Sequence, residues 1–357
     1  MKALVLKTAA RTASVKEVPR PVPGPGEVLI RVHAVALNPV DQIHFAGPIA
    51  AQDERVMGTD FAGVVVGRGE DLGGASGDAR TVDGARVAGF VQGEYVAAPY
   101  DLLWTIPEGL SFEDASTISM CGLTAAQALF PRFGLPSTFS PSSSSSSKAP
   151  ADSSSEPLNI FVYGSSTSLG MFGAQLAHVA AKASGRPLRL IGAASASRHE
   201  ALRAAPYGYD VLVDYRDEKW ADKVREATAG GRGVDFALDT ISERDTVPRI
   251  QPVYGAVWEG LGVEIDYGDG LVFPASPEAR KFAVDFFQFL SSGAEPGADV
   301  KLHPNPVRKM PGGLERIVPD GFALLSGLVS ERQGLEQRRE EEHMRPISGE
   351  KLVYTIV

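Results

Sequence analysis

The sequence predicts an α/β protein of two domains, one β-rich and barrel-like, the other built on a doubly wound parallel sheet. Short apolar runs punctuated by Gly and Pro fill the chain up to about residue 98, as in an all-β module. Strand and helix patterns alternate from residue 158 to 241, which is typical of a parallel sheet with right-handed crossovers. The length of 357 residues favours about two domains.

The β-rich half is predicted from runs of four or more apolar residues that are bounded by turn residues. They are KALVL (2–6), EVLIRVHAVAL (27–37), FAGVVVGRG (61–69), ARVAGFV (85–91) and EYVAA (94–98). The pattern changes to a helix over 110–130, where Ser111 can cap the start and Glu113 and Asp114 lie in the first turn. We expect the domain boundary here: residues 1–120, completed by 315–357, form one domain, and 121–314 form the other.

The second half begins with a Ser/Pro-rich stretch, 135–157, that has too few apolar residues to order itself. We expect it to be a disordered surface insertion. The alternating strands are then 158–164, 188–195, 210–215 and 234–241, with helices up to Lys182 and over 198–205 and 218–229. Further helices are predicted over 278–291 and 312–328, and a closing strand over 347–357.

Composition excludes several classes of protein. The net charge of −9 and pI near 5.3 argue against nucleic-acid or anionic-lipid partners. No run of about 18 apolar residues is present and the N-terminus does not resemble a secretion signal, so we expect a soluble, cytoplasmic protein with no membrane contact. Cys121 is the one cysteine and there are six scattered histidines, so neither a structural nor a catalytic zinc site can be built in its usual form, and no metal is expected.

The turn between the first alternating strand and its helix, GSSTSLG (164–170), is suited to a pyrophosphate. Gly164 allows a tight turn, and Gly170 allows helix and strand to approach closely. Thr167 occupies the position of the middle glycine of the G-x-G-x-x-G pattern. The turn therefore offers hydroxyls and backbone N–H groups at a helix N-terminus, from Gly164, Ser165, Ser166 and Thr167. Alone, such a turn can equally be a plain connector.

The end of the second strand favours NADP over NAD. It carries no acid for a ribose 2′-hydroxyl, but has hydroxyls and an arginine suited to a 2′-phosphate, in the segment Ser195, Ala196, Ser197 and Arg198. Alternatively, Arg198 is a solvated residue in the first turn of the next helix.

These segments together resemble the medium-chain dehydrogenase/reductase superfamily, in its zinc-free branch. The motifs are PRPVPGPGEVLIRVHAVALNPVDQIHFAG (19–47), VMGTDFAGVVVGRG (56–69), FVYGSSTSLGMFGAQL (161–176), DVLVDYR (210–216), FALDTIS (236–242), VKLHPNPVRKMPGGLERI (300–317) and SGEKLVYTI (348–356). These motifs are most similar to those of the trans-acting enoyl reductases that serve fungal polyketide synthases and the hybrids of these synthases with peptide synthetases. The stretch GTDFAG lacks the His-Glu pair that the zinc alcohol dehydrogenases of the superfamily show.

The resemblance implies a GroES-like domain and a Rossmann domain with an active site in the cleft between them. It implies NADPH as cofactor and, as substrate, an enoyl thioester on the acyl carrier domain of a separate polyketide synthase, with a monomeric enzyme. Cofactor contacts would come from Val40, Asp41, Gln42, Ile43, the turn Gly164 to Thr167, Ser195 to Arg198, Tyr215, Ile347 and Ser348. The substrate channel would be lined by Cys121, Gly122, Leu123, Thr124, Ala125, Ala126, Gln127 and Ala128.

No catalytic residue is assigned. Asp41 is expected to cap the segment after the NPVD turn, and Cys121 to be a small apolar residue. Asn38 could face the nicotinamide or only satisfy the turn, and Tyr215 could contact the adenosine end or only close a strand. Lys351 could orient substrate, although an exposed strand lysine is the simpler interpretation. His44 is the one histidine expected near the cleft.

The sequence departs from the family at two places, after VAGFVQG (87–93) and after FALDTIS (236–242), where residues or a whole fifth strand of the Rossmann sheet are missing. This is a genuine adaptation, a degenerate copy or an imperfect gene model. Two other functions therefore stay open: a free-standing NADPH quinone or enone reductase, and a non-catalytic synthase partner that has lost hydride transfer.

Overall fold

The computed structural model describes residues 1–47, 54–72, 77–90, 95–139, 156–243, 255–266, 270, 272–327 and 341–356. The chain divides into two compact units, here called the barrel unit (Met1–Met120 with Trp258–Val357) and the nucleotide unit (Cys121–Val257). Each is described by itself. In the described ranges, no helix is long and apolar enough to cross a membrane.

The barrel unit is built around one long strand, β3 (Glu27–Ala36), which pairs antiparallel with three others. These are β5 (Asp60–Arg68), β7 (Tyr95–Pro99) and β16 (Lys351–Thr355). The sheet continues through β6 (Arg86–Gly89) to β8 (Trp104–Thr105) on one side and from β16 to β15 (Val307–Lys309) on the other. A second sheet has the order β2 (Thr12–Glu17), β1 (Lys2–Lys7), β4 (Arg55–Val56).

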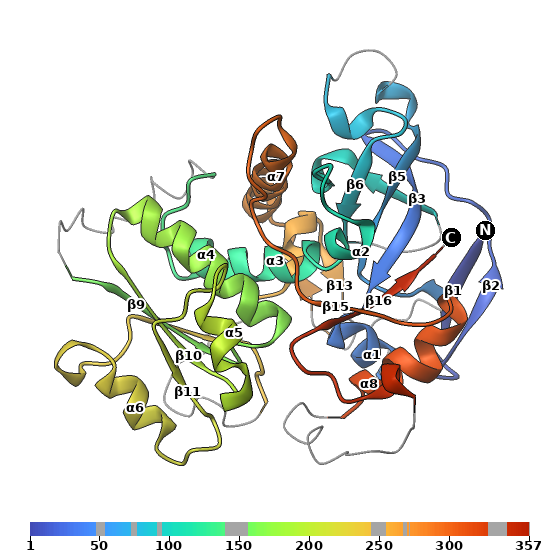
Figure 1. Ribbon diagram of the computed structural model, residues 1–357. Helices are drawn as coiled ribbons and strands as arrows, with labels where there is room; N and C mark the ends of the chain where they lie inside the picture. The colour runs from blue at the N-terminus through green and yellow to red at the C-terminus, as the bar shows by residue number, and fades with distance from the viewer. Residues whose placement is uncertain are drawn as a thin grey trace. The chain divides into compact units, whose positions relative to one another are not determined.

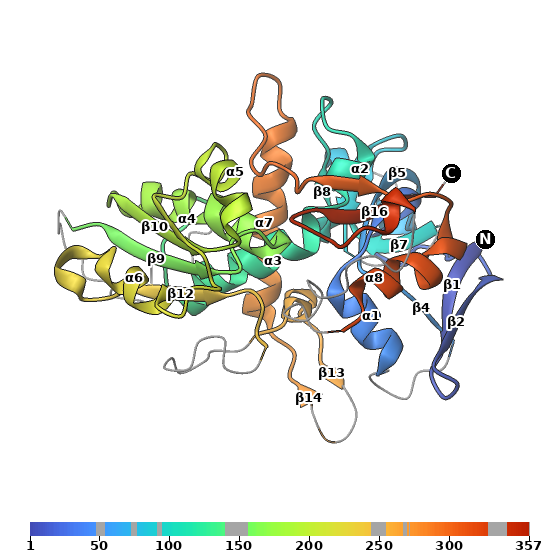
Figure 2. The same cartoon turned by 60° about the horizontal axis from the view of Figure 1, so that its bottom comes forward.

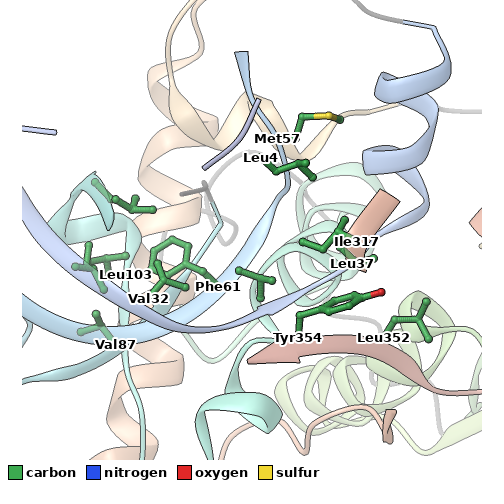
Figure 3. Packing of buried hydrophobic residues seen from close by; sticks show 14 of the residues in the cluster. Leu4, Val32, Leu37, Met57, Phe61, Val87, Leu103, Ile317, Leu352 and Tyr354 are labelled. Carbon is green, nitrogen blue, oxygen red and sulfur yellow. The ribbon is translucent and has the colours of Figure 1, made fainter. Parts of the chain in front are cut away.

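The core of the barrel unit is formed by residues that alternate along these strands, because successive side chains of a strand point to opposite faces. Figure 3 shows Val32, Phe61 and Val87 together at one end of this core and Leu352 and Tyr354 of the last strand at the other end, and all five are almost fully buried. The predicted strands at 2–6, 27–37, 61–69, 85–91 and 94–98 are confirmed as β1, β3, β5, β6 and β7.

Helix α7 (Pro277–Ser291) packs on the barrel unit. Ser276 caps it by accepting the N–H of Ala279 at 3.2 Å, and Pro277 occupies the first turn, where a missing N–H costs nothing. Its apolar face carries Phe286 and Phe287, and the ring of Phe287 lies 6.2 Å from that of Phe90. Residues 258–314, which the sequence analysis places in the second domain, therefore belong to the barrel unit.

The nucleotide unit is a parallel sheet with the strand order β11, β10, β9, β12. The strands are β9 (Leu158–Tyr163), β10 (Leu188–Ala193), β11 (Val211–Val213) and β12 (Phe236–Asp239). Its helices are α4 (Ser168–Ser184), α5 (His199–Arg203) and α6 (Trp220–Glu226), seen around the sheet in Figures 1 and 2. The predicted alternation is thus confirmed. Within the described part of this unit the sheet has four strands, and residues 244–254, where the family's next segment is expected, lie outside it.

Helices cover both faces of this sheet, as the doubly wound prediction requires. Phe161 of β9 packs with Ile191 and with Val224 and Trp220 of α6, and its ring lies 5.7 Å from that of Trp220. Leu238 of β12, which stands beside Val162 in register and so on the opposite face, contacts α4 at Gly173. The central strand is therefore buried on both sides and reads as a continuous apolar run.

Two predicted helices differ from the structure. The helix over 110–130 is broken into α2 (Phe112–Ala115) and α3 (Ser119–Gln127), followed by a π-turn (Ala128–Arg132) that contains Pro131. The helix over 312–328 is a series of short turns ending in α8 (Ala323–Leu325), with Pro319 inside the π-turn Ile317–Phe322. Proline removes a backbone donor and clashes with the preceding turn, which explains the irregular turns around Pro131 and Pro319, whereas the break between Ala115 and Ser119 contains no proline. Of the predicted insertion at 135–157, residues 140–155 lie outside the described part.

Candidate functional site

The turn between β9 and α4, here called the phosphate turn (164–170), is closed by its two end glycines. Gly164 has a φ of 77°, a conformation that glycine adopts without strain. A Cβ on Gly170 would overlap the carbonyl oxygen of Gly164 and would lie 3.0 Å from backbone atoms of Ser165. The helix N-terminus can therefore approach the strand end only because position 170 is glycine.

Two of the predicted phosphate-binding hydroxyls are engaged within the protein. Ser165, fully buried, donates to the carbonyl of Val162 at 2.9 Å. Thr167 caps α4 by accepting the N–H of Gly170 at 3.0 Å, and its own hydroxyl donates to Thr240 at 2.9 Å. The expectation that these hydroxyls face a phosphate is therefore revised. The first-turn N–H groups of α4 that Thr167 does not cap have no intrahelical acceptor, and they are the donors available to an anion.

The end of the second strand lies beside an acid that the sequence analysis missed. Asp214, directly after β11, accepts the N–H of Ala196 at 3.1 Å and that of Arg216 at 3.0 Å. Partial desolvation raises the pKa of Asp214, but these N–H donors outweigh it and hold that pKa below its ordinary value. The prediction of a pocket without an acid is correct for β10 and wrong for its neighbour. The sequence could have predicted Asp214 at this position, because the carboxyl ends of adjacent parallel strands meet at one edge of the sheet.

A second missed residue brings positive charge to the same edge. Arg216 lies with its guanidinium carbon 5.2 Å from the centre of the Tyr215 ring and its Nη1 3.5 Å from Asp214. Arg198, in the short turn Ala196–Arg198, is partly exposed. The segment Ser195 to Arg198 and Tyr215, predicted from the sequence for a 2′-phosphate, therefore gathers at one strand edge together with Asp214 and Arg216.

In the barrel unit, the predicted cofactor segment Val40 to Ile43 lies on α1 (Pro39–Ala46), where Val40 and Gln42 are partly exposed, Ile43 is exposed and Asp41 is buried. Asp41 accepts the N–H of Asn38 at 2.7 Å and the hydroxyl of Thr59 at 3.1 Å. Its expected capping role is confirmed. Asn38 is itself buried and donates to Thr59 at 2.7 Å, so its side chain satisfies the turn.

This cluster continues to a buried ion pair. Asp60, fully buried, accepts from Asn38 Nδ2 at 2.9 Å, from the backbone N–H of Met120 at 2.8 Å and from Lys351 Nζ at 2.6 Å. Lys351 also donates to the carbonyl of Thr117 at 3.1 Å and is 3% exposed. The expectation of an exposed strand lysine is wrong, because Lys351 lies with Val353 on the face of β16 opposite Leu352 and Tyr354, and that face is covered as well. We call Asn38, Asp41, Thr59, Asp60 and Lys351 the polar cluster.

Burial raises the pKa of Asp41 to about 7, with the nearby Asp60 adding to the effect. The hydrogen bonds from Asn38 and Thr59 and the charge of Lys351 act in the opposite direction and are weaker. With one ammonium facing two carboxyl groups, a proton on Asp41 leaves the polar cluster neutral. The carboxyl group of Asp41 thus keeps its proton in the native state at pH values where the same group in the unfolded chain has already lost its proton.

The stability of the protein should therefore fall as pH rises through this range. The native pKa of about 7 exceeds the unfolded value of 3.8, so the stabilisation from this proton is fully present below about pH 4 and is lost as the pH rises through about 7. Replacing Asp41 by asparagine keeps the two acceptor bonds and removes the titration. Between about pH 4 and about pH 8, the wild type should lose about 2 to 4 kcal/mol more free energy of unfolding than Asp41→Asn does. Urea unfolding at several pH values measures it, and parallel curves would contradict the assignment.

His44 lies on the same helix. Its ring centre is 5.9 Å from that of Trp258, and burial, assisted by the charge of Arg55, lowers the pKa of His44 to about 4. The imidazole is therefore neutral at physiological pH and can accept or donate one hydrogen bond but does not attract a phosphate.

Of the predicted substrate residues, five are buried within α3 and its continuation, namely Gly122, Leu123, Ala125, Ala126 and Gln127. Cys121, Thr124 and Ala128 are partly exposed and recur at i, i+3 and i+7, so they share one face of the helix. If this helix lines a substrate channel, this face does so. Cys121 is half-buried, as expected of a small apolar residue.

Ile347 and Ser348 lie in the turn before β16. Ile347 packs against the barrel core, and the N–H of Ser348 donates to Glu350 at 3.4 Å. Burial raises the pKa of Glu350, but Arg308 and Arg345 outweigh it and hold that pKa low. Two arginines on one carboxylate fix the conformation of this turn. In the described ranges, no three His, Cys, Asp or Glu side chains gather as a metal site would require.

Comparison with known proteins agrees with this architecture. Residues 24–108 match the family model of the alcohol dehydrogenase GroES-like domain. The chain is 30% identical to the trans-enoyl reductase ACTTS2 of Alternaria alternata, covering 99% of this chain and 98% of the relative. It is 29% identical to the enoyl reductase cheB of Chaetomium globosum, over 96% and 90% of the two chains. The structure of mycobacterial Rv1454c complexed with NADPH aligns with a TM-score of 0.60 at 19% identity over 99% of both chains, which shows the shared fold.

The GroES-like match, the parallel sheet in the described part of the nucleotide unit and the 30% identical relative together identify a medium-chain dehydrogenase/reductase, and the predicted fold class is confirmed. Within that superfamily, identity to ACTTS2 over nearly the full length of both chains shows that the chain belongs to the trans-enoyl reductases. The predicted resemblance is thus confirmed. The protein is an oxidoreductase of the class that acts on carbon–carbon double bonds.

Proposed function

We propose that the protein is a trans-acting enoyl reductase that uses NADPH to reduce the α,β-double bond of a polyketide intermediate. The intermediate is held as a thioester on the acyl carrier domain of a separate polyketide synthase or hybrid synthase. We further propose that the enzyme acts in the cytoplasm and as a monomer.

The phosphate turn carries this proposal. Its glycines let the N-terminus of α4 lie close against the end of β9, and the helix dipole favours negative charge at that N-terminus. At the neighbouring strand edge, the positive groups Arg198 and Arg216 suit the 2′-phosphate that distinguishes NADPH from NADH. Asp214 is held by backbone N–H groups and by Arg216, which reduces its repulsion of a phosphate.

Bound NADPH would supply the hydride for the double bond. The chain's own contribution is to bind and orient. The first turn of α4 would hold the diphosphate, and α1 and the Ile347–Ser348 turn would supply the remaining contacts that the family resemblance assigns. The exposed face of α3, with Cys121 and Thr124, would meet the acyl chain. Reduction of an enoyl thioester needs no metal to polarise the substrate, because the thioester carbonyl accepts the developing negative charge when hydrogen-bond donors face it.

The test measures NADPH binding and turnover on the purified protein. We expect NADPH to bind at micromolar concentration and to raise the melting temperature, with NADH binding at least about tenfold more weakly, a difference of about 1.4 kcal/mol. NADPH oxidation should be faster with an enoyl thioester on pantetheine or on a carrier domain than with a simple quinone. Arg198→Ala and Arg216→Ala should each weaken NADPH binding and leave NADH binding unchanged.

The other two functions are distinguished by the same measurements. Faster turnover of the quinone than of the thioester would support a free-standing quinone reductase. NADPH binding without turnover of either substrate, or no binding at all, would support a synthase partner that has lost hydride transfer. Co-expression with a candidate synthase adds an independent readout, because an active enzyme adds two hydrogens to the released product.

A further inference from the structure

We infer that Thr240, which follows the last strand of the nucleotide sheet, is a positioning residue for the diphosphate of the cofactor. The inference rests on the proposed function, since it concerns the same NADPH site. Thr240 contacts the phosphate turn and would act on the cofactor only through that turn.

Three hydroxyl and amide groups form a relay across the turn. The N–H of Gly170 donates to the hydroxyl oxygen of Thr167 at 3.0 Å, and the hydroxyl of Thr167 donates to that of Thr240 at 2.9 Å. The hydroxyl of Thr240 in turn reaches the carbonyl oxygens of Tyr163 at 2.8 Å and Gly164 at 3.1 Å. Each hydroxyl accepts one bond, Thr167 donates to Thr240, and the single proton of the Thr240 hydroxyl serves the two neighbouring carbonyls.

The relay joins both ends of the phosphate turn to a third segment. It begins in the first turn of α4, ends on the last residue of β9 and the first glycine of the turn, and passes through the residue after β12. The hydroxyl of Thr240, together with the backbone N–H groups of Thr240 and Thr167, holds the carbonyls of Tyr163 and Gly164 and so keeps these peptide groups from rotating toward a phosphate. A carbonyl oxygen there would repel the diphosphate that the N–H groups attract.

The segment that carries Thr240 is itself held in place. Asp239 accepts the N–H groups of Ile241 at 2.9 Å and Ser242 at 3.0 Å, which closes a tight turn directly after the strand. A Cβ on Gly164 would overlap the hydroxyl of Thr240 and would lie 3.0 Å from Ile241. The phosphate turn is therefore packed against this segment as well as bonded to it, and the sequence shortening begins only beyond these residues.

The consequence is that Thr240 sets cofactor affinity more than the rate of turnover. Loss of this half-buried hydroxyl leaves the hydroxyl of Thr167 without its acceptor and leaves the carbonyls of Tyr163 and Gly164 with one backbone donor each, so the turn can sample conformations that do not bind phosphate. Since Thr240 touches the phosphate turn, which would hold the diphosphate, saturating NADPH should restore most of the rate.

The experiment compares Thr240→Val, Thr240→Ser and a matched control, Thr228→Val. Thr228 is a buried threonine of the same unit whose hydroxyl donates to Arg225 at 2.7 Å and accepts the N–H of Gly233 at 2.9 Å, so valine there also removes two hydrogen bonds. We expect Thr240→Val to raise the Kd for NADPH about tenfold while kcat at saturating NADPH changes less than about threefold. Thr240→Ser should restore the Kd to within about twofold of wild type, and Thr228→Val should lower the melting temperature without changing the Kd.

Two outcomes would overturn the inference alone: an unchanged Kd in Thr240→Val while the wild type binds NADPH, or an equal rise in Kd in Thr228→Val. In the second case the effect would come from general destabilisation of the unit. A wild-type protein that does not bind NADPH would instead contradict the proposed function. If Thr240→Val does not fold, the Thr240→Ser and Thr240→Ala variants give the same comparison of Kd with melting temperature.

Discussion

Replacing Lys351 by methionine is expected to lower the free energy of unfolding by about 3 to 5 kcal/mol. Lys351 Nζ lies 2.6 Å from Asp60 Oδ2, and neither residue is more than 3% exposed. Methionine fills a similar volume but leaves the carboxylate of Asp60 buried with hydrogen-bond donors and no cation. An uncompensated buried charge is among the most destabilising changes in a protein interior.

Two variants separate this effect from a simple loss of packing. Asp60→Asn combined with Lys351→Met should recover part of the stability, because no unpaired charge then remains. Lys281→Met, which breaks the exposed pair of Lys281 and Asp285 at 2.9 Å, should change stability by about 0 to 1 kcal/mol. Urea unfolding measures all four proteins. If Lys351→Met lowers the free energy of unfolding no more than Lys281→Met does, the buried ion pair contributes no more to stability than the exposed one.

Replacing Gly170 by alanine is expected to raise the Kd for NADPH by at least about thirtyfold, or about 2 kcal/mol, and to lower stability by about 1 to 3 kcal/mol. The new methyl group would overlap the carbonyl oxygen of Gly164, and the backbone of Ser165 stands 3.0 Å away. Backbone atoms cannot rotate aside, so the strand end and the helix must separate. The N–H groups of the first turn then no longer converge on one anion.

Gly173→Ala is the matched control, one turn further along the same helix. Its Cβ would lie 2.8 Å from the end of the Leu238 side chain, which can adopt another rotamer. We expect a moderate change in stability and an NADPH affinity within about twofold of wild type. Fluorescence titration of NADPH with thermal unfolding of both variants tests the difference. Equal loss of affinity in the two would mean that helix packing, and not the geometry of the turn, controls binding.

The elements whose pattern is strictly local could be predicted from the sequence. The strands β1, β3, β5 and β9 are apolar runs with turn residues at both ends, and the helix α4 has a cap at Thr167. Near Pro131 and Pro319 the apolar periodicity extends beyond the point where the helix ends, so the predicted helices were too long. The packing of α7 on the barrel unit depends on the complementary surface around Phe90, which no local pattern contains.

Within the candidate site, sequence reasoning located the phosphate turn but misjudged what its side chains do. Hydroxyls in a Gly/Ser-rich turn look available, and only the neighbouring carbonyl of Val162 and the hydroxyl of Thr240 show that Ser165 and Thr167 are already bonded. Asp214 and Thr240 were missed for one reason. Through the strand order of the sheet, Asp214 lies next to the end of β10 and Thr240 next to the phosphate turn, although these neighbours are about 20 and 75 positions apart in the chain (194 to 214 and 164 to 240). Lys351 was misread because its partner is Asp60, at the other end of the chain.

The pairing of β3 with β16 places Ala36 opposite Val353, with the whole nucleotide unit between them in sequence. On a translating ribosome, the nucleotide unit has all of its strands long before the barrel sheet receives its last one. Until then the end of β3 that pairs with β16 has an open edge, and Asp60 lacks the ammonium of Lys351. The incomplete barrel unit is therefore exposed to aggregation and to chaperones. Production of the protein should therefore respond more strongly to changes in the last strand than to equally buried changes in the nucleotide sheet.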